Sequence, residues 1–294
     1  MARLPAMTTI RLIGIDVDGT LLDSSGGMPE ANRLAIHQAV VSGVHVALVT
    51  GRSYPFARPV ADGLPDTISL IVSNGAIERR TDGSTIGRQL LDRTVAADVL
   101  EMTRPFRDAA ALIFDRDEER QLVFESMDWE LPGRKAYWMR NRARIARSQP
   151  LEAALDEDPI QVMFNGSVPA MRALAAELGA KRGRHRSGEG EKSLSFAVSL
   201  TEYEHRDFSL VDITSPAATK GEALGRCAGR LGLSAQEVMA IGDNFNDLTM
   251  LEFAGVAVVM GNAVPALKTR GWHVTGHHDQ AGVAEAIGRF VLSA

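Results

Sequence analysis

Five short apolar runs, rich in Val and Ile, recur along the chain without a clean alternation of apolar and polar residues. Such runs are typical of parallel strands that are covered on both faces. Segments with helical periodicity lie between them, and the alternation predicts a doubly wound α/β sheet. The expected strands are 10–15, 44–49, 69–72, 238–241 and 255–260, and the expected helices are 29–43, 216–232 and 247–255.

The middle of the chain follows a different pattern. Residues 78–86 predict a hairpin that turns at Asp82-Gly83. The order of elements from about residue 88 to 208 then predicts an α+β module with an antiparallel sheet. We therefore expect a Rossmann-like, mostly parallel core built from residues 1–87 and 209–294, with an inserted cap domain at 88–208. The elements expected in the insert are helices at about 94–108 and 168–179 and strands at 110–114, 121–124, 159–164, 193–200 and 208–213.

Composition narrows the classes of function. The chain has 294 residues, 45% of them hydrophobic, and its net charge of -5 does not indicate a nucleic-acid partner. The single cysteine, Cys227, excludes an intrachain disulfide and fits a reducing compartment. The apolar run 10–15 is short and interrupted by Arg11, so no signal peptide is expected. No apolar run reaches the roughly 18 residues that a membrane span needs. We predict a cytoplasmic protein without a membrane partner, either a monomer or a weak homodimer.

Two polar clusters have more than one interpretation. The stretch 134–147 carries six basic residues and no acid. A solvated helix face is the simpler interpretation, and a surface that attracts an anionic substrate is the alternative. His277, His278 and Asp279 resemble metal ligands, but an adjacent pair of histidines without further ligands in the sequence favours a surface loop.

Polar residues follow each of the five expected strands. These turns are Asp16 to Thr20, Thr50 to Arg52, Ser73 to Gly75, Gly242 to Asp247, and Gly261 with Asn262. Because ligands bind in the crevice at the carboxyl ends of the strands of an open α/β sheet, we expect these turns to meet at one site.

The acids among these turns indicate a metal. A cluster of Asp16, Asp18 and Asp243 is costly to bury unless a cation offsets its charge. Mg²⁺ prefers oxygen ligands and is commonly bound by one or two carboxylates together with a substrate phosphate. The alternative is an acidic loop that caps helices and binds nothing.

Lys220 supplies the opposite charge. The chain has five lysines against 27 arginines, and this one lies near the start of an expected helix, where a cation is disfavoured. An ammonium there can hold an anion together with free backbone N–H groups. Thr50 offers a hydroxyl, and Gly51 an amide, to the same anion. The set describes a phosphoryl site in which Asp16 is the nucleophile and Asp18 the general acid and base.

These residues resemble a known family. The segments "DVDGTLL", "VTGR", "ATKGEAL" and "GDNFNDLTML" are similar to the four motifs of the haloacid dehalogenase-like hydrolase superfamily. The segments "SNGA" and "MGNA" and the position of the insert resemble the Cof-type subfamily, which has an α/β cap of class IIB. The resemblance implies a Mg²⁺-dependent phosphatase that acts through an aspartyl-phosphate.

The resemblance also implies roles for individual residues. Asp16 matches the nucleophile and a metal ligand, and Asp18 matches the acid and base whose backbone carbonyl binds the metal. Asp243 matches the acidic metal ligand. Thr50 and Lys220 match the residues that bind phosphate, and Asn246 and Asp247 match the positions that support phosphate and lysine. Supporting positions with less defined roles are matched by Arg52, Asn74 and Asn262.

An acid at position 18 favours a phosphate ester over an organohalide as the substrate. The dehalogenases of the superfamily lack this acid, because a halide leaves without protonation. The expected partner is therefore a small phosphomonoester. A phosphosugar mutase shares these motifs and stays an alternative. A regulator that only carries an aspartyl-phosphate is a second alternative, but a receiver module of roughly 120 residues would leave the insert unexplained.

Overall fold

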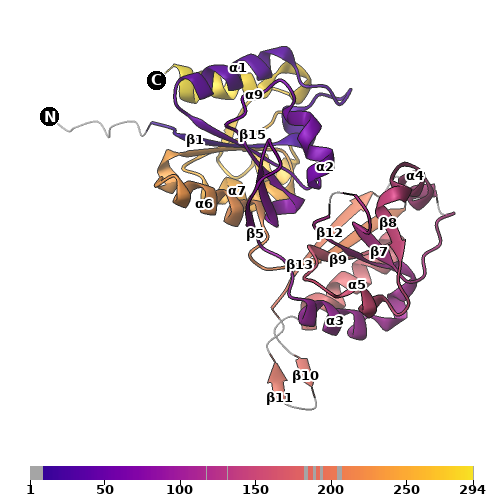
Figure 1. The fold of residues 1–294 in the computed structure, drawn as a ribbon. Helices are drawn as coiled ribbons and strands as arrows, with labels where there is room; N and C mark the ends of the chain where they lie inside the picture. The colour runs from indigo at the N-terminus through magenta and orange to yellow at the C-terminus, as the bar shows by residue number, and fades with distance from the viewer. Residues whose placement is uncertain are drawn as a thin grey trace. The chain divides into compact units, whose positions relative to one another are not determined.

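The computed structural model describes residues 9–116, 118–130, 132–181, 185–187, 190–192, 195–203 and 207–293. The chain divides into two compact units. Unit 1 comprises Met1–Arg88 with Ala217–Ala294, and unit 2 comprises Gln89–Pro216 (Figure 1). No helix of the described residues is long and apolar enough to cross a membrane.

Unit 1 is built on an eight-stranded sheet with the order β16-β15-β14-β1-β2-β3-β4-β5. The pairs from β16 to β3 are all parallel, whereas β4 and β5 are antiparallel to their neighbours. The five strands expected from the apolar runs are therefore confirmed as one parallel sheet, and the hairpin at Asp82-Gly83 is confirmed as its antiparallel edge. The bounds are β1 Leu12–Asp16, β2 His45–Val49, β3 Ser69–Val72, β4 Ile77–Arg80, β5 Thr85–Arg88, β14 Val238–Gly242, β15 Val256–Val259 and β16 His273–Val274.

Helices cover both faces of this sheet, as a doubly wound fold requires (Figure 1). α1 (Glu30–Val41) and α9 (Gly282–Ile287) pack together on one face, and α6 (Lys220–Arg230) and α7 (Leu248–Phe253) pack together on the other. Every residue of β1 and β14 is buried, which explains their continuous apolar sequences. The short helices are α2 (Tyr54–Ala57) and α8 (Pro265–Lys268).

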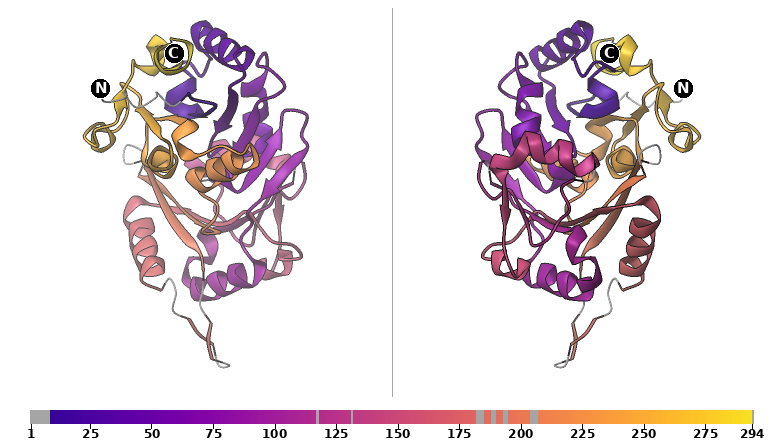
Figure 2. Two further views of the ribbon diagram at one scale, coloured as in Figure 1. Left: turned by 90° about the vertical axis from the view of Figure 1, so that its left-hand side faces the viewer. Right: turned by 90° about the vertical axis from the view of Figure 1, so that its right-hand side faces the viewer.

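Unit 2 contains a six-stranded sheet with the order β12-β13-β9-β6-β7-β8. α3 (Arg93–Met102) and α5 (Val168–Lys181) cover one face of this sheet (Figures 1 and 2). The core on that face consists of apolar side chains from alternate strand positions and from the helices. The sheet is antiparallel as expected, except that β8 pairs in parallel with β7. The bounds are α3 Arg93–Met102, β6 Ala110–Ile113, β7 Leu122–Phe124, α4 Pro132–Asn141, β8 Ile145–Arg147, β9 Gln161–Gly166, α5 Val168–Lys181, β12 Ala197–Tyr203 and β13 Phe208–Thr214, with a separate pair β10 His185–Ser187 and β11 Gly190–Lys192.

Three expected boundaries differ from the structure. The start of the second core segment was expected at residue 209, inside β13, but β13 pairs with β9 and β12, so the division falls after Pro216. The helix expected from residue 216 begins at Lys220, because the side chain of Thr219 accepts a hydrogen bond from the backbone N–H of Glu222 and caps the helix there. The first helix of the insert ends at Met102 and is followed by 3-10 turns.

Candidate active site

The expected site lies where the parallel strands of unit 1 end. Asp16 is the last residue of β1, Thr50 follows β2, and Gly242 is the last residue of β14. β1 lies between β2 and β14 in the sheet, so the three turns are neighbours. The polar residues that follow the strands therefore converge, as the strand-end rule predicts.

Lys220 joins two of the acids inside this site. Its Nζ donates to Asp16 Oδ1 at 2.5 Å and to Asp247 Oδ1 at 2.6 Å. The side chains of Lys220 and Asp247 are fully buried, and that of Asp16 nearly so. An ammonium group has three N–H donors, so one is left for an anionic ligand. A lysine at the first position of α6 is thus positioned between the nucleophile candidate and a supporting acid.

The pKa values of this pair follow from burial and charge. Burial and the charge of Asp247 raise the pKa of Asp16, Lys220 opposes them, and the net pKa is about 8. Desolvation would lower the pKa of Lys220, but the charges of Asp16 and Asp247 and the hydrogen bonds to them raise it overall. Lys220 therefore stays an ammonium ion, and the raised pKa of Asp16 shows that one ammonium does not offset the charge of all three acids.

Asp243 follows β14 and is held against the turn after β1. Burial and the charge of Asp247 raise the pKa of Asp243 to about 6, and Thr20 Oγ1 donates to its Oδ1 at 3.4 Å. Gly19 has φ +81°, and a Cβ at this position would lie 2.4 Å from Asp243 Oδ2. Only glycine fits there. Asn262 Nδ2 donates to the carbonyl of Gly19 at 2.7 Å, which gives Asn262 a defined supporting contact.

The acids of this site fit a divalent cation. Carboxylate oxygens of Asp16, Asp243 and Asp247 all lie within 4.8 Å of one another. Asp247 uses one oxygen for Lys220 and the other for the backbone N–H groups of Asp243 and Asn244, at 2.9 and 3.0 Å. Asp16 and Asp243 are therefore the better ligands. When all three acids are ionised, three carboxylates against one ammonium leave two negative charges, which an ion such as Mg²⁺ would offset.

Asp18 is turned toward an arginine. Arg52 donates from Nε to Asp18 Oδ2 at 2.9 Å and from Nη2 to Asp18 Oδ1 at 2.6 Å. This bidentate pair fixes the carboxylate in the partly exposed rim of the site, where 59% of the Asp18 side chain is accessible. The two aspartates of the motif, which only Val17 separates, thus have different partners. Asp16 pairs with Lys220, and Asp18 pairs with Arg52.

The turn after β2 is closed by backbone contacts. Thr50 is buried, and its Oγ1 accepts from the Arg52 N–H at 3.1 Å. Asn74 donates its backbone N–H to Thr50 O at 3.0 Å, and its Oδ1 would lie 3.1 Å from a Cβ at Gly51. That buried Oδ1 has no hydrogen-bond partner among the described residues. Asn246 is exposed in the short 3-10 helix Phe245–Asp247.

A cleft of about 410 Å³ opens beside this rim, entirely within unit 1. Arg52 lines it and thereby connects it to Asp18. Arg33 and Asp62 add charged groups to its wall. The apolar lining consists of Leu22, Met28, Phe56, Pro59 and Val60.

The basic stretch 134–147 is largely exposed, as expected of a solvated face, but Arg134 is an exception. Arg134 is buried and donates through Nη2 to Asn165 O at 2.7 Å and through Nε to Asn165 Oδ1. Lys135 pairs with Glu130, and Arg147 donates to the carbonyl of Glu125 at 2.9 Å. The buried Arg134 links α4 to β9, and the sequence pattern does not distinguish it from the exposed cations of the stretch.

Comparison with known proteins identifies the family. The model of the haloacid dehalogenase-like hydrolases matches residues 13–287. The chain belongs to this family. The hydrolase is 29% identical over 286 residues to the phosphatase YwpJ of Bacillus subtilis, covering 95% of this chain and 99% of that protein. It is 26% identical over 285 residues to the 5-amino-6-(5-phospho-D-ribitylamino)uracil phosphatase YcsE of the same organism, covering 96% of both.

A solved structure supports the fold of the hydrolase. A haloacid dehalogenase-like hydrolase from Bacteroides thetaiotaomicron superposes with a TM-score of 0.73 at 22% identity, covering 96% of this chain and 99% of that chain. The Rossmann-like core with an inserted second unit is thus the architecture of known family members.

Two features of the site were missed by reasoning from the sequence. Asp247 lies within the carboxylate cluster itself, and its place four residues after Asp243 in the same motif was the available signal. The pairing of Arg52 with Asp18 had no signal in the sequence beyond the presence of both residues at strand ends.

Proposed function

We propose that this hydrolase is a Mg²⁺-dependent phosphatase that cleaves a small phosphomonoester through an aspartyl-phosphate on Asp16. The observation that carries the proposal is the buried Lys220, whose ammonium holds Asp16 and Asp247 and keeps one donor for a phosphate oxygen. The names of the relatives, which are phosphatases, support the same class of reaction.

In the first step, a carboxylate oxygen of Asp16 attacks phosphorus and the bond from phosphorus to the ester oxygen breaks. For this step Asp18 must leave its bidentate pair with Arg52 and carry a proton, which it gives to the leaving oxygen, so the organic product departs as a neutral alcohol. Asp18 lies two residues after Asp16 and is oriented by Arg52, so it approaches the phosphoryl group from a different side than Lys220.

In the second step, Asp18 takes a proton from water, and the resulting hydroxide attacks the phosphorus of the acyl phosphate. The bond from phosphorus to Asp16 breaks, and inorganic phosphate and the free carboxylate are regenerated. Thr50 and the amide of Gly51 are proposed to hold the phosphate oxygens, with Asn246 at the rim. A mutase would instead exclude water at this step, which makes release of free phosphate the deciding product.

Asp16 and Asp243 would hold Mg²⁺, with the backbone carbonyl of Asp18 as a third protein ligand. The ion supplies positive charge that offsets the phosphate and the buried carboxylates. Asp247 acts as a support by orienting Lys220 and the backbone of residues 243–244.

The cleft beside Arg52 is proposed to receive the organic part of the substrate. Its five apolar side chains favour a leaving group with an apolar surface, and its volume of about 410 Å³ suits a small metabolite. A sugar phosphate or a phosphorylated heterocycle satisfies both conditions.

Hydrolysis of p-nitrophenyl phosphate tests the proposal. Purified protein with added MgCl₂ is expected to release nitrophenol and inorganic phosphate together, and EDTA is expected to stop both. Full activity in EDTA would contradict the metal assignment. A panel of phosphorylated metabolites, compared by kcat/KM, then identifies the substrate class.

A further inference from the structure

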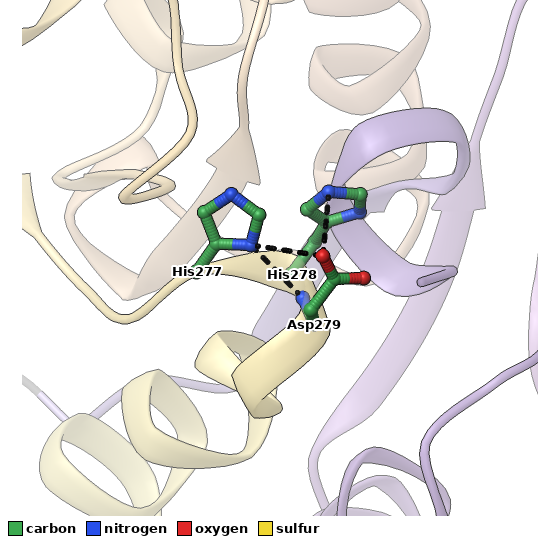
Figure 3. Close-up of side chains that lie close together, drawn as sticks. All are labelled: His277, His278 and Asp279. Carbon is green, nitrogen blue, oxygen red and sulfur yellow. Dashed lines mark hydrogen bonds and ion pairs between the residues drawn. The ribbon is translucent and has the colours of Figure 1, made fainter. Parts of the chain in front are cut away.

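Three potential metal ligands gather at one turn of unit 1, apart from the carboxylates around Lys220 (Figure 3). His277 Nδ1 lies 3.5 Å from Asp279 Oδ2, and His278 Nε2 lies 3.8 Å from the same oxygen. The three ligand atoms are all within 4.8 Å of one another. Ligands of a tetrahedral ion with bonds of about 2.1 Å are separated by roughly 3.4 Å, so only a small adjustment is needed.

The proton of His278 is placed by its surroundings. Its Nδ1 lies 2.9 Å from the carbonyl oxygen of Leu22, and a carbonyl can only accept, so Nδ1 carries the proton. When the ring is neutral, Nε2 presents its lone pair toward Asp279. A neutral imidazole that donates its other N–H to a backbone carbonyl is the form in which histidine binds metals.

His277 and Asp279 also present lone pairs to this point. His277 Nδ1 accepts from the Asp279 N–H at a long 3.2 Å, so it carries no proton, and an ion would replace this N–H as the partner of its one lone pair. Ser24 donates to Asp279 Oδ1 at 2.7 Å and to Oδ2 at 2.8 Å. Those bonds lower the pKa of Asp279 and fix its carboxylate, and Oδ2 keeps a second lone pair. With both rings neutral, three potential ligand atoms therefore lie within 4.8 Å of one another.

We infer that His277, His278 and Asp279 form a second metal site, for a late first-row divalent ion such as Zn²⁺. Two imidazoles and one carboxylate suit Zn²⁺, Ni²⁺ or Cu²⁺ and do not suit Mg²⁺. Water completes the coordination on the exposed side. Through Leu22 and Ser24 the bound ion braces residues 22–24, the loop that follows the turn of Asp16 and Asp18.

Equilibrium dialysis of the full-length protein against Zn²⁺ tests the site. The protein is first freed of metals and then saturated with Mg²⁺, which occupies the carboxylates near Lys220. The wild type is expected to retain a single Zn²⁺ per chain. His277→Ala is expected to weaken Zn²⁺ binding by about tenfold or more, because a ligand is lost while the contacts to Leu22 and Ser24 stay. His273→Ala, which changes a histidine packed on Phe290, is the matched control and should bind as the wild type does.

A double variant separates the two sites. Asp16→Asn with Asp243→Asn removes the proposed Mg²⁺ ligands and is expected to keep the Zn²⁺ affinity of the wild type. The inference is wrong if this variant loses Zn²⁺ binding, if the wild type retains no Zn²⁺ under excess Mg²⁺, or if His277→Ala, checked for an unchanged circular dichroism spectrum, binds Zn²⁺ as tightly as the wild type.

Discussion

Asp247 accepts a 2.6 Å hydrogen bond from Lys220, and both side chains are completely buried. The other oxygen of Asp247 holds the backbone N–H groups of Asp243 and Asn244. The carboxylate of Asp247 therefore positions Lys220, which contacts the proposed nucleophile Asp16. It also positions the loop that carries Asp243, a proposed metal ligand. Asp247 is a positioning residue whose effects on stability and on catalysis are coupled.

Asp247→Asn is expected to damage both properties. The amide keeps one oxygen and cannot serve Lys220 and the two N–H groups together, and the buried ammonium loses a counter-charge. Breaking a buried ion pair costs about 3–5 kcal/mol, and we expect a loss near the lower end because Asp16 still pairs with Lys220. Urea unfolding and kcat on p-nitrophenyl phosphate measure the two effects. Glu252→Gln, in an exposed pair with Arg270, is the control and should change neither.

Asp18→Asn is expected to separate the two chemical steps. The side chain is exposed and paired only with Arg52, so the fold should tolerate the amide. With an activated aryl phosphate, whose leaving group needs little protonation, the first step should continue while the attack of water slows by roughly 10²–10⁴-fold. Rapid-quench kinetics should then show a burst of nitrophenol followed by a slow steady state. A uniform loss without a burst would exclude Asp18 as the base of the second step.

Asp212 should make stability depend on pH. Burial raises the pKa of this residue of β13 to about 7 from 3.8, while Gln161 donates to its Oδ1 at 2.8 Å. Between these two values the folded protein keeps a proton that the unfolded chain releases, so the free energy of unfolding falls as pH rises from about 4 to about 7 and then levels.

Asp212→Asn removes that penalty and keeps an acceptor for Gln161. The variant should therefore be more stable than the wild type above about pH 7, by about 1 kcal/mol or more, and the advantage should vanish near pH 4. Urea unfolding of both proteins across this range gives the difference directly. An advantage that is constant with pH would show that Asp212 does not titrate as described.

Cys227 is expected to be inert in the folded protein. It is buried in α6, and burial together with the charge of Glu78 raises the pKa of its thiol to about 12. Because the thiolate is the reactive form, Ellman's reagent should label the native chain very slowly and the urea-unfolded chain at once. Fast labelling under native conditions would contradict the packing of α6.

The parallel sheet could be predicted because its strands are buried on both faces and so have continuous apolar sequences. The start of α6 could not be predicted, because Pro216 and Thr219 are both residue types that begin helices. The hydrogen bond from the Glu222 N–H to the Thr219 side chain decides for Thr219. The two-unit division was expected, but its second boundary needed the strand pairing of β13.

The prediction of the site from the sequence was limited in the same way. Strand ends predicted that Asp16 and Asp243 would meet, because backbone topology alone brings them together. Side-chain direction is not contained in that topology. The pairing of Asp18 with Arg52, the hydrogen bonds of Asp247 to the backbone of residues 243–244 and the burial of Arg134 against Asn165 all depend on it, and each became visible only in the structure.

Borohydride trapping tests the central claim most directly, because borohydride reduces an acyl phosphate to an alcohol. Asp18→Asn, mixed with p-nitrophenyl phosphate and MgCl₂ and then quenched with borohydride, should yield a tryptic peptide in which residue 16 has become homoserine. Asp16→Asn should yield none. Reduction at another carboxylate, or turnover with no reduced residue at all, would contradict an aspartyl-phosphate on Asp16.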